Sequence, residues 1–225
     1  MAVSVAVVDS GVNVPHPHLP AVAGGIAIDF EGKVTGTYVD RLGHGTAAAA
    51  AIHEKAPEAE LWVVKVFDTD LATTVATLVR AIDWASERGC ALVNLSLGTP
   101  NDFREAELAP AIERAVARGA IVVSAFEHEG MRWYPGSIPG ALGVVMDVAQ
   151  PRESVAVFEI DGRAVLRASP YPRPIPGVPP ERNLNGISFA VANATGVLAG
   201  LLAAQPDVRS ANEAIVLVAA EGRLS

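Results

Sequence analysis

The sequence is short of several features that would each point to a particular class of protein. It has one cysteine, Cys90, which excludes an internal disulfide and favours a reducing compartment. Charged residues make up only 19% of the chain and hydrophobic residues make up 50%, which excludes a largely disordered protein. Basic residues are outnumbered, with a formal net charge of −8, so the composition argues against a nucleic-acid partner.

The N-terminal stretch MAVSVAVVDSG lacks a basic leader and a small-residue cleavage site, so we expect no signal peptide. We also expect no membrane span, because we expect no apolar run as long as the roughly 18–20 residues that a bilayer requires. The length of 225 residues suits one domain with one good-sized core. These features predict a single domain over residues 1–225, located in the cytoplasm.

Short apolar runs alternate with helix-like stretches through most of the chain. The runs are continuous and rich in Val and Ile, as in strands that are buried on both faces. The candidate strands are residues 2–8, 61–67, 91–97, 120–126 and 141–148. The helical stretches between them end at Pro57, Gly89 and Gly119, which are typical of helix C-termini. This alternation predicts an α/β fold with helices on both faces of a mostly parallel sheet.

The C-terminal third departs from this alternation. Residues 155–169 predict a hairpin that turns at Asp161-Gly162. Residues 169–180 are rich in proline and predict an extended loop. Residues 188–206 are apolar nearly all round, which predicts a helix in the centre of the molecule.

Polar residues stand at the ends of these predicted elements, where ligands bind to parallel sheets. Asp9 follows the first strand, while His44 and Ser188 lie at helix starts and each follow a glycine. A serine at a helix N-terminus has its backbone N–H free to face an oxyanion. A histidine can accept the serine proton, and a buried aspartate can hold the imidazole in the required tautomer. The order Asp, His, Ser is one of those in which this catalytic triad occurs.

Motifs along nearly the whole chain resemble, in the same order, those of the subtilisin-like serine proteases, the subtilases. VAVVDSGVNVPHPHL resembles the aspartate motif, GHGTAAAAAI the histidine motif, and NGISFAVANATG the serine motif. AIDWASERGCALVNLSLGTP resembles the helix and strand that lead to the substrate-binding edge. The resemblance implies a subtilisin-like three-layer sandwich with a mostly parallel central sheet. It also implies Asp9 as orienting acid, His44 as general base and acid, and Ser188 as nucleophile.

The resemblance further implies two segments that hold a peptide substrate. One is an edge that the substrate backbone extends as an added strand, formed by Ser96, Leu97 and Gly98. The other is the wall of the specificity pocket, formed by Ala125, Phe126 and Glu127. A glutamate in this wall would either fill the pocket or select a basic residue on the acyl side of the scissile bond.

The run Glu127-His128-Glu129 follows a predicted buried strand. Subtilases usually read Gly-Asn-Glu-Gly here, and their asparagine donates a hydrogen bond to the oxyanion. His128 stands at the asparagine position, and a histidine N–H can donate in its place. A solvated charged turn is the alternative interpretation. Side chains alternate along a strand, so the glutamates would point away from the histidine, which disfavours a metal site.

The sequence predicts no metal site and no cofactor. In many subtilases a calcium-binding loop interrupts the helix after the histidine motif, and AAAAAIHEKAPEAE has no such loop. His18 stands at the position of a calcium ligand of the family. The spacing of His16 and His18 would suit a metal, but no further ligands are evident. By the same resemblance, we recognise no pro-segment before Asp9.

The resemblance implies a serine endopeptidase that hydrolyses peptide or protein substrates through an acyl-enzyme on Ser188. Its specificity would be narrow, as in the maturation of a peptide precursor. One alternative is a peptide transferase or macrocyclase, in which an amine resolves the same acyl-enzyme. Another is a catalytically impaired scaffold that binds peptides, which the changes at Glu127 and His128 would favour. These interpretations leave room for a partner subunit, and none requires nucleic acid or a membrane.

Overall fold

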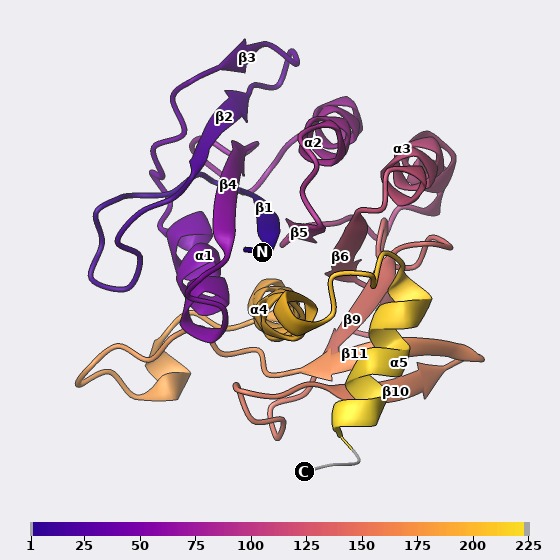
Figure 1. The fold of residues 1–225 in the computed structure, drawn as a ribbon. Coiled ribbons are helices and arrows are strands. Elements are labelled where there is room, and N and C mark those ends of the chain that lie inside the picture. The colour runs from indigo at the N-terminus through magenta and orange to yellow at the C-terminus, as the bar shows by residue number, and fades with distance from the viewer. Residues whose placement is uncertain (1, 223–225) are drawn as a thin grey trace.

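A nine-stranded sheet runs through the middle of the molecule, with helices on both of its faces (Figure 1). The computed structural model describes residues 2–222. In spatial order the strands are β10 (Ala156–Ile160), β11 (Arg163–Ala168), β9 (Leu142–Met146), β6 (Ile121–Ala125), β5 (Leu92–Leu95), β1 (Ser4–Asp9), β4 (Glu60–Lys65), β2 (Gly24–Ile28) and β3 (Val34–Thr35). The pairs are parallel except at the two margins, where β10–β11 and β2–β3 are antiparallel. The sheet therefore confirms the predicted α/β class.

The helices form the two outer layers. One face packs against α1 (His44–Lys55), α4 (Ile187–Ala204) and α5 (Ala211–Glu221). The other face packs against α2 (Val75–Glu87) and α3 (Glu105–Ala117). Two short 3₁₀ helices, η1 (Asp102–Arg104) and η2 (Pro180–Arg182), lie in connecting segments. A separate small hairpin joins β7 (Glu127–His128) to β8 (Met131–Arg132).

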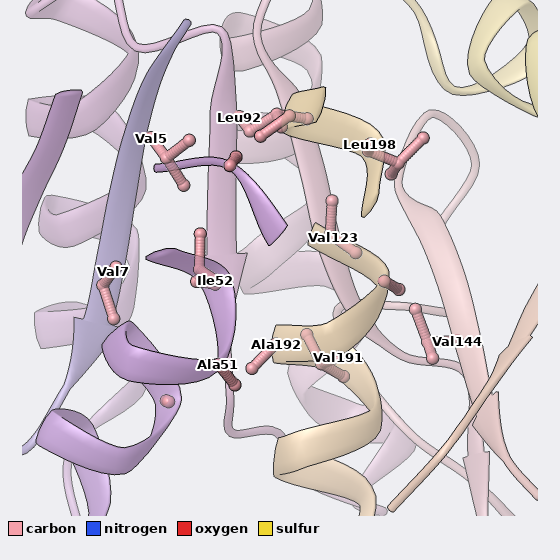
Figure 2. Packing of buried hydrophobic residues seen from close by; sticks show 14 of the residues in the cluster. Val5, Val7, Ala51, Ile52, Leu92, Val123, Val144, Val191, Ala192 and Leu198 are labelled. Atoms are coloured by element: carbon pink, nitrogen blue, oxygen red, sulfur yellow. The ribbon is translucent and has the colours of Figure 1, made fainter. Parts of the chain in front are cut away.

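The packing of α1 against α4 positions the starts of both helices. Small residues of α1, including Ala51, face α4 in the buried core (Figure 2). Gly196 of α4 lies against α1 so closely that an added β-carbon would be 3.0 Å from the Cα of Ile52. The helices can approach this closely only because the residues between them are small. As a result, His44 and Ser188, which lie in the first turns of these two helices, are carried by one rigid pair.

The sheet side of this core is built from the alternate residues of the parallel strands. Val5 and Val7 of β1, Val123 of β6 and Val144 of β9 point at the helices that carry Ile52, Val191 and Leu198 (Figure 2). Apolar burial on both faces explains why these strands read as continuous Val-rich runs. Asp9 ends β1 at the carboxyl edge of the sheet, within the buried interior.

Several predicted boundaries differ from those in the structure. The sequence interpretation omitted β2, β3 and α5, which lie at the margins and are only partly buried. The helix that was predicted to end at Gly119 corresponds to α3, which contains Pro110. The hairpin over β10 and β11 is confirmed, with Asp161 and Gly162 at its turn.

The prediction that no apolar run reaches membrane-spanning length was wrong for α4. By length and composition this helix could cross a membrane, but 67% of it is buried inside the fold. Its apolar surface is covered by the sheet and by α1, as expected for a central core helix.

Candidate active site

Asp9 and His44 form the buried part of the site. The carboxylate of Asp9 is fully buried, and its Oδ1 lies 2.7 Å from Nδ1 of His44. The same oxygen accepts the backbone N–H of Ser10 at 2.7 Å. Because the carboxylate accepts a hydrogen bond from Nδ1–H, the neutral imidazole has its Nε2 free to act as a base.

The pKa of His44 reflects opposing effects. Burial disfavours the charged imidazolium and lowers the pKa, whereas the hydrogen bond and charge of Asp9 raise it, with a further contribution from the charge of Asp40. The net result is a pKa above the ordinary value of 6.5. The site is therefore built to stabilise a positive charge on His44.

Asp40 organises the turn that leads into α1, and sequence analysis did not single it out. Its Oδ1 accepts hydrogen bonds from the Ser10 hydroxyl at 2.8 Å and from the backbone N–H groups of Leu42 and Gly43 at 3.0 and 2.9 Å. Its Oδ2 accepts from the backbone and hydroxyl of Thr46 at 2.9 and 2.6 Å. An acidic residue just before a helix start was the available signal, because carboxylates satisfy the free N–H groups there.

Ser188 lies in the first turn of α4. Gly186 precedes the helix with φ of 142°, a conformation that favours glycine. The Ser188 hydroxyl donates to the carbonyl oxygen of Ser96 at 2.9 Å. The next residue, Phe189, contacts the imidazole of His44 with ring centroids 5.1 Å apart. The structure therefore brings the starts of α1 and α4 together beside Asp9, and first-turn N–H groups lack intrahelical acceptors.

Ser188 faces a cleft of about 770 Å³. Of the predicted substrate-binding residues, the cleft is lined by Ser96, Leu97, Gly98 and Ala125, and the predicted oxyanion donor His128 lines it as well. Residues 71–76, which sequence analysis did not propose, also line the cleft. The edge after β5 and the end of β6 thus meet beside the serine, as parallel strands with adjacent carboxyl ends should.

Phe126 and Glu127, which the sequence placed in the wall of the specificity pocket, are not among the residues that line this cleft. Phe126 is fully buried beneath the guanidinium groups of Arg132 and Arg163, which lie 4.2 and 5.2 Å from its ring centroid. Glu127 lies in β7 opposite Arg132. The chain turns from β6 into the β7–β8 hairpin after Ala125, so these two side chains leave the wall of the cleft.

The β7–β8 hairpin holds His128 at the cleft. Its turn consists of Glu129 and Gly130, with φ of 53° and 74°, as in the tight turns that suit two-residue hairpin loops. The imidazole of His128 meets the indole of Trp133 edge to face, with centroids 5.6 Å apart. Its Nδ1 is buried and has no hydrogen-bond partner among residues 2–222. Glu129 is exposed to solvent in this turn, whereas His128 lines the cleft.

The histidines proposed as weak metal candidates lie elsewhere. His16 and His18 form a surface turn in which the backbone N–H of His18 donates to Nδ1 of His16 at 3.2 Å. Within the described part of the chain, no group of three or more His, Cys, Asp or Glu side chains is arranged as a metal site.

Comparison with known proteins identifies the family. The model of the subtilase family matches residues 1–164. Subtilisin BL of Lederbergia lenta is 31% identical over 213 residues, which cover 88% of this chain and 75% of that protein. The minor extracellular protease Epr of Bacillus subtilis (strain 168) is 31% identical over 179 residues, covering 75% of this chain. This chain spans only 26% of the length of Epr.

Solved structures show the same fold. The S41 psychrophilic protease superposes with a TM-score of 0.70 at 21% identity, covering 97% of this chain and 82% of that one. The prenylagaramide maturation protease PagA superposes with a TM-score of 0.66 at 24% identity, covering 91% and 76%. These likenesses establish the subtilisin-like three-layer arrangement. With the family match, they show that the chain belongs to the subtilase family of serine peptidases.

Proposed function

We propose that this chain is an endopeptidase that hydrolyses peptide bonds through an acyl-enzyme on Ser188, with His44 and Asp9 completing the triad. The observation that carries the proposal is the 2.7 Å contact between Asp9 Oδ1 and His44 Nδ1, next to a cleft that Ser188 lines. A buried carboxylate that holds an imidazole beside a serine at a helix start is the arrangement that activates a serine hydroxyl.

The reaction would run in two halves. The Ser188 hydroxyl turns from the Ser96 carbonyl and attacks the substrate carbonyl, while Nε2 of His44 accepts the proton. The imidazolium, stabilised by Asp9, then protonates the leaving amine as the tetrahedral intermediate collapses to an ester. Water attacks the ester with His44 again as base, and the carboxylic acid product leaves with Ser188 regenerated.

The oxyanion of each intermediate would be held by two donors. One is the backbone N–H of Ser188, which lies in the first turn of α4. The other is the imidazole of His128, which lines the same cleft. A ring N–H would replace the amide N–H of the asparagine that is usual in the family.

The finer part of the proposal is a narrow substrate range, as in the maturation of a peptide precursor. PagA, a structural neighbour, is described as a maturation protease. That likeness concerns the fold, so it supports the precursor role only as an analogy. The single cysteine supports a cytoplasmic setting, with a peptide or protein as the substrate.

A fluorophosphonate probe tests the proposal because it forms a covalent adduct only with an activated serine. We expect the wild type to be labelled at Ser188, and Ser188→Ala and His44→Ala to remain unlabelled. Mass spectrometry of peptides incubated with the wild type should show products that have gained one water. Products without that water would indicate transfer to an amine, and absence of labelling would indicate a peptide-binding scaffold.

A further inference from the structure

Trp133 lies between the two segments of the cleft that face the substrate. Its indole lines the cleft together with Gly98, Ala125 and Ser188. A β-carbon added at Gly98 would lie 3.0 Å from Cε3 of the indole. The other side of the indole meets the imidazole of His128 at 5.6 Å between centroids. The indole therefore fills the space between the edge at Gly98 and the β7–β8 hairpin.

Hydrogen bonds hold the backbone of Trp133 in this place. Its N–H donates to the carbonyl oxygen of Phe126 at 3.0 Å, and its own carbonyl accepts from the hydroxyl and backbone N–H of Ser137 at 2.7 and 3.0 Å. The next residue, Tyr134, exchanges two backbone hydrogen bonds with Thr99, both of 2.9 Å. The backbone at Trp133 and Tyr134 is thus anchored both to the end of β6 and to the substrate edge.

The residues next to the indole are small, and the indole reduces the space that they leave for a substrate side chain. A peptide that paired with the edge at 96–98 and presented its carbonyl to Ser188 would bring the side chain of its acyl residue into the cleft that Gly98 and Ala125 also line. Glycine and alanine line that space with almost no side chain of their own. The large aromatic ring of Trp133 takes up part of that space, because it lies beside Gly98 and lines the cleft with Ala125.

We propose that Trp133 determines the specificity of this site by admitting only a small side chain, such as Gly, Ala or Ser, at the acyl residue. The inference rests on the proposed peptidase function. It replaces a charge-selecting role for Glu127, whose side chain does not line the cleft. An indole that lies between Gly98 and His128 forms a wall of the cleft, and a single extra methylene in an apolar pocket changes rates by ~10–200-fold.

Peptidyl diphenyl phosphonates test this inference because the side chain of the phosphonate residue occupies the acyl position during labelling. We would compare phosphonates bearing the side chains of Ala, Leu, Phe and Arg, with the fluorophosphonate probe as a reference that has no such side chain. We expect the wild type to react with the Ala compound at least about tenfold faster than with the Leu, Phe and Arg compounds.

Trp133→Ala should reverse this preference, so that the Leu and Phe compounds label this variant at least about tenfold faster than the Ala compound does. Trp133→Phe leaves a smaller ring in the cleft and should show an intermediate preference. This variant tests the inference if the alanine variant does not fold. Trp84→Phe is the matched control, because Trp84 lies on α2 against Trp62 and outside the cleft. Its profile should equal that of the wild type.

The outcomes separate the two proposals. A wild type that reacts with the fluorophosphonate and equally well with the Phe and Ala compounds overturns the role of Trp133 and leaves the peptidase intact. Preference for the Arg compound, lost in Glu127→Gln, overturns it in favour of charge selection. Failure of the wild type to react with any probe overturns both proposals, because no acyl residue is then selected.

Discussion

The hydroxyl of Ser188 donates a hydrogen bond to the carbonyl oxygen of Ser96 at 2.9 Å. Ser96 is itself held by Asn94, whose Nδ2 donates to the Ser96 hydroxyl at 2.6 Å. Asn94 Oδ1 lies in turn 2.9 Å from the hydroxyl of Thr195, which shares its proton between this oxygen and the carbonyl oxygen of Val191, also at 2.9 Å. The nucleophile, the substrate edge and the buried middle of α4 are therefore linked by one chain of hydrogen bonds. A substrate N–H that binds the Ser96 carbonyl would free the hydroxyl to turn toward His44.

Removal of the buried Thr195 hydroxyl should destabilise the protein. Thr195→Val keeps the shape but leaves the Asn94 oxygen without its donor, and an unsatisfied buried polar group costs about 1–3 kcal/mol. Urea denaturation would measure the loss in the free energy of unfolding. Thr195→Ser is the control, since it retains the hydroxyl. Equal stability of the two variants would contradict a role for this hydrogen bond.

Asp9→Asn should reduce kcat by about 10⁴ while the fold is retained, because the amide favours the wrong imidazole tautomer. Steady-state hydrolysis of any peptide that the wild type cleaves would measure the effect. Circular dichroism would establish that the variant is folded. A decrease of less than tenfold would mean that Asp9 does not orient His44 during the reaction.

His128→Ala should lower kcat by about 10²-fold or more, as expected for the loss of one oxyanion donor. His128→Asn is the informative partner, because its amide restores a donor of the kind usual in the family. We expect the asparagine variant to retain much of the wild-type rate. If the alanine and asparagine variants are equally active, His128 does not stabilise the oxyanion.

The rate of fluorophosphonate labelling should fall as the pH falls through the pKa of His44. The neutral imidazole is the base, and the pKa lies above 6.5, so the midpoint of the loss should also lie above 6.5. Asp40→Asn removes one of the charges that raise this pKa and should shift the midpoint to lower pH. A wild-type midpoint at or below 6.5 would contradict this electrostatic account.

Cys90 should be inert in the folded protein. Its thiol is buried, and burial raises its pKa to about 12, so almost no thiolate forms near neutral pH. Titration with a chromogenic disulfide reagent should detect no thiol until denaturant is added, and one thiol afterwards. Rapid reaction of the native protein would show that the segment between α2 and β5, which contains Cys90, opens readily.

The sequence by itself was enough to predict the central strands, the helices that cover them and the order of Asp9, His44 and Ser188. These are local signals: buried parallel strands read as unbroken apolar runs, and helices end at Gly or Pro. The position of Ser96–Gly98 at the carboxyl edge of the sheet follows from the same logic, because residues that end adjacent parallel strands lie together. Its use as an edge for the substrate backbone is what the family resemblance implies.

Only the tertiary structure decided which side chains line the cleft. Phe126 and Glu127 turn away because a hairpin begins after Ala125, while Trp133 enters because its backbone pairs with Phe126 and its neighbour pairs with Thr99. Such contacts join segments that are distant in the chain, so the local sequence pattern does not predict them. The anchoring of the start of α1 by Asp40 through Ser10 depends on the same kind of long-range contact.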